Sequence, residues 1–96
     1  MRPSIALQTH RDAIREIALS HRVKNVRVFE SVLHGDDTED SDLDLLVDPT
    51  TETTLFDIAK IQVELKELLG VAVQVLTPRA LPDKFREHVI QEAQPV

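Results

Sequence analysis

The hydrophobic pattern divides the chain into alternating helical and extended segments. Apolar residues at helical spacing predict three helices, over residues 4 to about 21, 55–69, and from Pro82 or Asp83 to about Glu92. Shorter apolar runs predict three strands, over residues 26–30, 42–48 and 71–76. This order predicts an α/β (α+β) fold, with a small three-stranded mixed sheet and helices packed on one side of it.

Local signals refine the ends of these elements. Ser4 is the expected N-cap of the first helix, and Gly70 is well placed just beyond the end of the helix at 55–69. The strand at 42–48 is nearly continuous in Leu and Val, as expected for a strand covered on both faces. The tail, residues 93–96, is expected to be frayed.

Length and composition narrow the class of protein. Ninety-six residues predict a single domain, 1–96, too short for a separate substrate domain. The formal net charge of −6 argues against direct nucleic-acid binding and suits a basic protein partner. There is no cysteine, hence no disulfide and no thiolate metal site. Neither a membrane span nor a signal peptide is indicated, so we expect a cytoplasmic protein.

Two aspartates at the start of the second strand are the first candidate site. Side chains alternate along a strand, so Asp42 and Asp44 project on the same side with Cα atoms about 6–7 Å apart. Like charges at that distance repel each other, and the usual reason to keep them is a divalent cation such as Mg²⁺. The alternative is a solvated pair that marks the boundary between loop and strand.

The residues upstream favour the cation site. The first strand ends at Phe29, Ser31 follows, and Gly35 and Asp36 come shortly after. A serine hydroxyl and free backbone amides at such a turn can hold a phosphate, and carboxylates across the turn can carry the metal that bridges phosphates. Of the acidic residues in the loop, only Asp36 is expected to belong to the site, and the others to be solvated: Asp37, Glu39 and Asp40.

This stretch resembles the motif of the DNA polymerase β-like nucleotidyltransferases, and most of all that of the minimal nucleotidyltransferases. Their motif runs Gly-Ser-x-x-x-Gly-Asp-x-x-x-x-Ser-Asp-x-Asp-Leu. The residues that fall in register are Ser31, Gly35, Asp36, Ser41, Asp42, Asp44 and Leu45. The resemblance covers nearly the whole chain and implies the polymerase β-like nucleotidyltransferase fold.

Two positions depart from the family pattern. Glu30 replaces the first glycine, where the backbone approaches the ligand or adopts positive φ, and its carboxylate would repel nucleotide phosphates. Gln74 stands where the family usually has a third carboxylate, and its amide is neither charged nor a base. The fold tolerates both changes, whereas the activity of this sequence is left open.

The resemblance implies an enzyme that transfers AMP from ATP, with Mg²⁺, to a tyrosine hydroxyl of a HEPN-family RNase toxin, and so acts as the antitoxin. Asp42 and Asp44 would hold the metal, and the triphosphate would lie against Glu30, Ser31, Gly35, Asp36 and Ser41. The alternative is a catalytically impaired module that neutralises the toxin by forming a complex. Three basic residues near the last helix are read as solvated rather than as phosphate contacts: Arg79, Lys84 and Arg86.

Overall fold

The computed structural model describes all residues, 1–96, and confirms the α/β class. Its helices are α1 (Pro3–Thr9), α2 (Arg11–Leu19), α3 (Ser31–His34), α4 (Leu55–Leu69), the 3₁₀ helix η1 (Pro78–Ala80) and α5 (Asp83–Glu92). Its strands are β1 (Val23–Phe29), β2 (Leu43–Pro49), β3 (Val73–Leu76) and β4 (Gln94–Pro95). None of the helices is long and apolar enough to cross a membrane.

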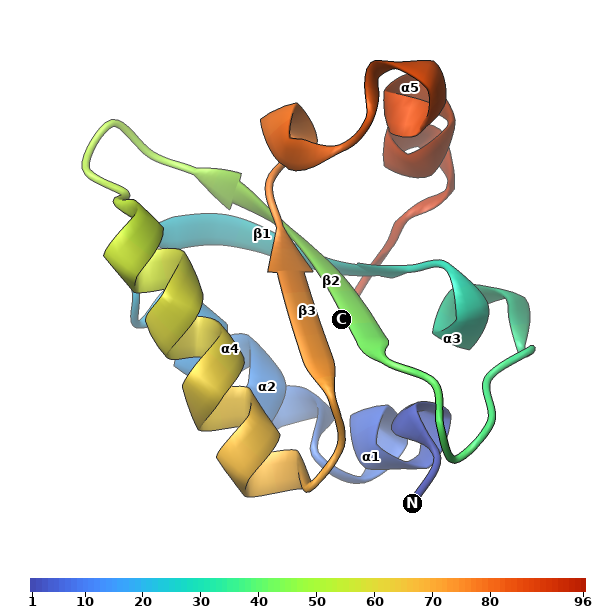
Figure 1. Ribbon diagram of the computed structural model, residues 1–96. Helices are drawn as coiled ribbons and strands as arrows, with labels where there is room; N and C mark the ends of the chain where they lie inside the picture. The colour runs from blue at the N-terminus through green and yellow to red at the C-terminus, as the bar shows by residue number, and fades with distance from the viewer.

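The sheet has four strands in the order β3-β2-β1-β4, one more than predicted. Figure 1 labels the three longer strands, β1, β2 and β3. β2 runs antiparallel to β1 and parallel to β3. The additional strand, β4, lies in the tail, which was wrongly expected to fray. The Val96 amide donates to the Val26 carbonyl at 2.9 Å, and the Arg15 guanidinium donates to the Val96 carbonyl at 2.8 Å. Because these partners are distant in sequence, no local sequence pattern predicts that they pair.

Helices cover both faces of the sheet. α1, α2 and α4 bury one face, with Ile14, Ile61 and Leu65 fully enclosed against the strands. α5 lies across part of the other face, opposite α4 in Figure 1. It packs in a smaller apolar cluster of Phe29, Leu46, Leu81, Val89 and Ala93. The prediction of helices on one side only was therefore wrong, although the prediction that β2 is covered on both faces holds at Leu46.

The first predicted helix is broken into two at His10, whose φ of −122° and ψ of 27° interrupt the helical path. The N-cap of α1 is Arg2, and Ser4 lies inside the helix. The Ser4 amide donates to the Asp37 carboxylate at 2.8 Å, and the Arg2 guanidinium donates to the Asp37 carbonyl at 2.8 Å. A residue from the loop before β2 thus replaces the expected local cap.

α4 begins and ends at the expected residues. Thr54 and Asp57 form a reciprocal capping box, in which each side chain accepts from the other residue's amide. The hydrogen bond from the Thr54 amide is the main reason that the pKa of Asp57 lies below its usual value. Gly70 ends the helix with a φ of 68°, a left-handed conformation that glycine adopts without strain. Both signals are local, which is why the sequence revealed them.

Candidate active site

A pocket of about 540 Å³ opens on the sheet face that α5 only partly covers. The pocket is surrounded by the end of β1, the loop before β2 and the start of β2, the strand β3, and the segment from residue 81 into α5. The residues that line it are Phe29, Glu30, Ser31, Asp40, Ser41, Asp42, Asp44, Gln74, Leu76, Leu81, Pro82, Phe85 and Val89. Most of the predicted site residues are among them.

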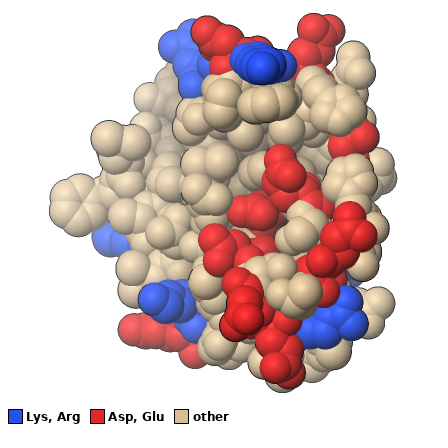
Figure 2. All heavy atoms as spheres, turned by 45° about the vertical axis from the view of Figure 1, so that its right-hand side comes forward, with Lys and Arg blue, Asp and Glu red and all other residues tan.

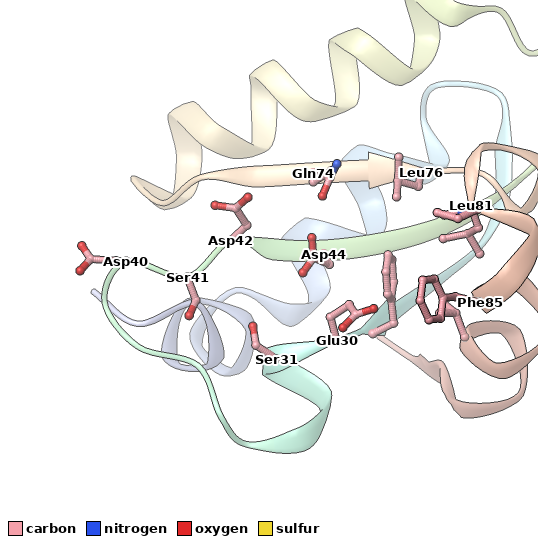
Figure 3. A pocket seen from close by; sticks show the side chains of 13 residues that line it. Glu30, Ser31, Asp40, Ser41, Asp42, Asp44, Gln74, Leu76, Leu81 and Phe85 are labelled. Carbon is pink, nitrogen blue, oxygen red and sulfur yellow. The ribbon is translucent and has the colours of Figure 1, made fainter.

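The two motif aspartates lie on the pocket side of β2, as their spacing predicts. Leu43 and Leu45 are fully buried on the opposite face, so the alternation of the strand turns Asp44 towards the pocket. Asp44 is half-buried and Asp42 is exposed. In the parallel ladder Asp44 is the direct neighbour of Gln74, which places the Gln74 amide beside the Asp44 carboxylate (Figure 3).

The end of β1 brings a second segment to the same place. Phe29 pairs with Asp44 in the antiparallel register, so the next two residues, Glu30 and Ser31, reach the pocket. Glu30 has a φ of 62° and a ψ of −138°, a conformation that suits glycine and strains other residues. The expectation that this turn requires positive φ is confirmed.

Gly35 and Asp36 do not line the pocket. Gly35 ends α3 with a φ of 74°, and the Asp36 amide donates to the Ser31 carbonyl at 2.9 Å, so both residues shape the loop. The Asp36 side chain is exposed. The structure thus corrects the expectation that Asp36 alone of the loop acids belongs to the site: Asp40 lines the pocket instead.

The expectation of a solvated Asp37 was also wrong, because Asp37 is 3% exposed. Burial alone would raise the pKa of its carboxyl group, but hydrogen bonds from Ser4 and the charge of Arg2 hold that pKa below its usual value. Asp37 therefore anchors the motif loop on α1. No local signal separates it from its acidic neighbours, because its partners are more than 30 residues away.

The carboxylates make the pocket strongly acidic. Burial, together with the negative charges of Asp42 and Glu30, raises the pKa of Asp44 to about 6. No Lys or Arg lines the pocket. Figure 2 shows Asp and Glu side chains gathered on this face of the molecule, with Lys and Arg around its edges.

Apolar side chains form the other end of the pocket, which the sequence did not reveal. Leu76, Leu81 and Phe85 lie together beyond Glu30 and Asp44, away from Asp42 (Figure 3). Phe85 is 53% exposed at the rim, and the Lys84 ammonium group lies over its ring, 5.7 Å from the centre. A flat apolar group fits this end, beside a polar end that suits phosphates and a cation.

Arg86 holds the apolar end in place rather than being solvated. Its guanidinium donates to the carbonyls of Pro78 at 2.8 Å, Leu81 at 3.0 Å and Arg79 at 3.2 Å, and pairs with Asp83 at 2.7 Å. These bonds fix η1 against the first turn of α5. The Arg86 guanidinium is thus engaged by three backbone carbonyls and one carboxylate, so the expectation that it is solvated was wrong.

The donor chemistry of the pocket fits a hard divalent cation. Asp42 and Asp44 offer carboxylate oxygens, and Gln74 offers an amide oxygen beside them. The repulsion at Asp44 is a further sign of fit, since a bound cation would relieve it. As the side chains stand, no three His, Asp or Glu residues converge on one point to hold an ion.

Comparison with known proteins agrees with this geometry. Residues 12–96 match the family model described as "Polymerase beta, Nucleotidyltransferase". "Putative protein adenylyltransferase MJ0435" of Methanocaldococcus jannaschii is 34% identical over 80% of this chain and 83% of its own length. "Protein adenylyltransferase MntA" of Thermococcus cleftensis is 30% identical over 90% of this chain and 84% of its own length.

Solved structures agree as well. A structure described as "Structure of putative minimal nucleotidyltransferase" superposes with a TM-score of 0.86 at 41% identity, over 97% of this chain and 95% of that one. A structure described as "Crystal structure of the toxin-antitoxin with AMP-PNP" shares the fold, with a TM-score of 0.74 at 15% identity, over 88% of this chain and 69% of that one.

The sheet, the motif turn and the paired aspartates define a nucleotidyltransferase domain. The chain belongs to the polymerase β nucleotidyltransferase family and, within it, to the minimal nucleotidyltransferases.

Proposed function

We propose that this protein transfers AMP from ATP, with Mg²⁺, to a tyrosine hydroxyl of a HEPN-family RNase toxin and is the antitoxin of that pair. The observation that carries the proposal is the convergence of Ser31, Asp42 and Asp44 in one pocket with an apolar end. The names of two relatives, both protein adenylyltransferases, support the reaction type. We expect the whole domain, 1–96, to act in the cytoplasm.

The reaction assigns a part to each end of the pocket. The acceptor oxygen forms a bond to the α-phosphorus of ATP, the bond from that phosphorus to the α–β bridging oxygen breaks, and pyrophosphate leaves with the electron pair. The hydroxyl proton passes to a pocket carboxylate. Ser31 and the backbone near it hold the triphosphate, and Ser41 lies beside them at the polar end.

Asp42 and Asp44 would hold the Mg²⁺, which supplies positive charge against the triphosphate and the departing pyrophosphate. The pocket itself provides no such charge, because no Lys or Arg lines it. The exposed ring of Phe85 and its neighbours Leu76 and Leu81 suit an aromatic group, either the adenine or the acceptor side chain.

A second function is favoured by the acidic character of the same face. Glu30 and Gln74 weaken a phosphate site, and an acidic surface can cover a basic RNase without any transfer. Such a module would neutralise the toxin by forming a complex.

Transfer of labelled AMP from ATP to a HEPN RNase separates the two functions. We expect labelling with the unaltered chain and loss of labelling with Asp42→Asn, while both chains bind the RNase equally. Replacing the acceptor tyrosine by phenylalanine tests the hydroxyl. Neutralisation by Asp42→Asn with no labelling by either chain would favour the binding module.

A further inference from the structure

The apolar end of the pocket offers a ligand no hydrogen-bonding side chain. Six residues form it, and all six side chains are hydrocarbon: Phe29, Leu76, Leu81, Pro82, Phe85 and Val89. The polar lining residues nearest to this end, Glu30 and Gln74, lie beside Asp44 in Figure 3, and Gln74 is the direct ladder neighbour of Asp44. These polar groups therefore belong with the carboxylates at the other end.

The backbone of the apolar end is occupied by contacts within the protein. The Leu81 carbonyl accepts from the Arg86 guanidinium at 3.0 Å, and the Leu81 amide donates to the Pro78 carbonyl at 3.2 Å. The Pro82 carbonyl accepts from the amides of Phe85 and Arg86 at 3.0 and 2.9 Å, and proline has no N–H of its own. A ligand at this end therefore meets no unengaged backbone group of Leu81 or Pro82.

Phe85 supplies an aromatic surface at the rim of this end. Its side chain is 53% exposed, and the Lys84 ammonium group lies over the ring, 5.7 Å from its centre. Lys84 is not a lining residue, so this cation covers the ring from outside the pocket. The pocket side of the ring is left for a stacked group, and stacking is tolerant of sequence because every nucleobase has a π face.

The position of the apolar end suits the base of a nucleotide better than the acceptor side chain. The acceptor hydroxyl must reach the α-phosphorus, which the proposed function places at Asp42 and Asp44. The base is separated from that phosphorus by the ribose, whereas the ring of a tyrosine is joined directly to the reacting oxygen. The apolar end lies beyond Asp44, on the side away from Asp42, as the longer span to the base requires (Figure 3).

We propose that the apolar end holds the nucleotide base by stacking on Phe85 without reading its edge, so that the site accepts GTP as readily as ATP. The inference rests on the proposed function and widens its donor to purine nucleoside triphosphates. GTP reacts as ATP does: the acceptor oxygen bonds to its α-phosphorus, pyrophosphate leaves with the electron pair, and GMP is transferred. Adenine and guanine differ in the donors and acceptors on their edges, and this end has none to distinguish them.

The size of the preference between the two purines separates stacking from hydrogen-bond recognition. A site built to hydrogen-bond a ligand rejects an analogue that lacks the matching group by factors on the order of 10⁴. A site that stacks the base has no such means of rejection. We therefore expect the dissociation constants of ATP and GTP to agree within about fivefold.

Calorimetric titration of ATP and of GTP, each with Mg²⁺, into the unaltered chain and three variants tests the proposal. Phe85→Ala removes the ring and should weaken both nucleotides about tenfold or more, whereas Phe85→Trp keeps an aromatic face and should retain both affinities. Phe56→Ala is the matched control, because Phe56 is an exposed ring with the Lys60 ammonium 6.0 Å from its centre but lies on α4, outside the pocket. It should leave both affinities unchanged, and thermal unfolding checks that every variant is folded.

The outcomes distinguish the inference from the proposed function. Binding of ATP with GTP weaker by more than about fivefold would show that the edge of the base is recognised, and would overturn the inference while the proposed function stands. Equal affinities in Phe85→Ala and the unaltered chain would place the base elsewhere and would also overturn the inference alone. If neither nucleotide binds to the unaltered chain, the proposed function fails and the inference fails with it.

Discussion

Asp44 and Gln74 are direct neighbours on the parallel strands β2 and β3. The Asp44 carboxylate is repelled by the negative charges of Asp42 and Glu30, whereas the Gln74 amide is neutral. Gln74 therefore contributes no charge that could offset the repulsion at Asp44. The half-buried Asp44 lies between the carboxylates of Asp42 and Glu30, and no cationic side chain offsets them. The cation-free protein should therefore gain stability whenever one of these charges is removed.

The pH dependence of stability should reveal the charge of Asp44. Its pKa is about 6 in the folded protein, above the usual value of 3.8, so the folded state binds the proton more tightly than the unfolded state. The free energy of unfolding should then fall as pH rises from about 4 to about 6. Asp44→Asn should remove this fall and stabilise the cation-free protein by about 1 kcal/mol at neutral pH, a value that allows for solvent screening of the half-exposed carboxyl.

Urea denaturation in EDTA at a series of pH values measures this effect, with Asp36→Asn as the control on an exposed carboxyl. Below pH about 4 Asp44→Asn and the unaltered chain should be equally stable. A stability difference that persists undiminished at low pH would show that the asparagine acts through packing and not through charge.

The strain at Glu30 predicts a second stabilising change. Glu30→Gly should raise the free energy of unfolding by about 1 kcal/mol in EDTA, because glycine adopts a φ of 62° without strain. This value is the strain relieved less the larger backbone entropy that glycine loses on folding. Glu30→Gln separates strain from charge, since it keeps the strained backbone. Chemical denaturation of both variants is the measurement. Equal stabilisation by glycine and glutamine would assign the whole effect to charge.

Asp37 should be the most sensitive residue of the motif loop. Asp37→Ala leaves the Arg2 guanidinium and the Ser4 amide without the carboxylate and should cost about 2–3 kcal/mol of stability. Because the pKa of Asp37 lies below 3.8, its contribution should be complete above that pH and be lost as pH falls through the lower, folded-state value. Denaturation of Asp37→Ala beside Asp36→Ala measures the difference, and similar small losses in both would contradict the anchoring role.

Arg86 should be needed for the apolar end of the pocket. Arg86→Ala removes the donor to three backbone carbonyls and should cost about 1–2 kcal/mol. Arg86→Lys should not restore the loss, because one ammonium group cannot reproduce the planar fork of donors. Glu87→Ala, at an exposed position of the same helix outside the pocket, is the control. Limited proteolysis around residues 78–83 reports the loosening, and full rescue by lysine would contradict this account.

The sequence by itself determined the features that depend on neighbouring residues. The alternation of β2 placed Asp42 and Asp44 on one face, and Thr54 and Gly70 set the two ends of α4. The positive φ at Glu30 was expected because the resembling family motif has glycine at this position, a residue used where the backbone adopts positive φ. Backbone sterics and the two-residue period of a strand depend only on residues that are consecutive in the sequence.

Only the tertiary structure decided which distant residues meet. Tertiary contacts make Asp37, and not Asp36, the buried anchor of the motif loop, and they pair the tail with β1. They also place α5 across the sheet, so that Phe85 and Leu81 complete the pocket. Each of these contacts joins segments far apart in the chain, and nothing in the spacing of nearby residues encodes the partner. The chemistry of the carboxylates could be predicted from the sequence, whereas the apolar end beside them arises from how the whole chain packs.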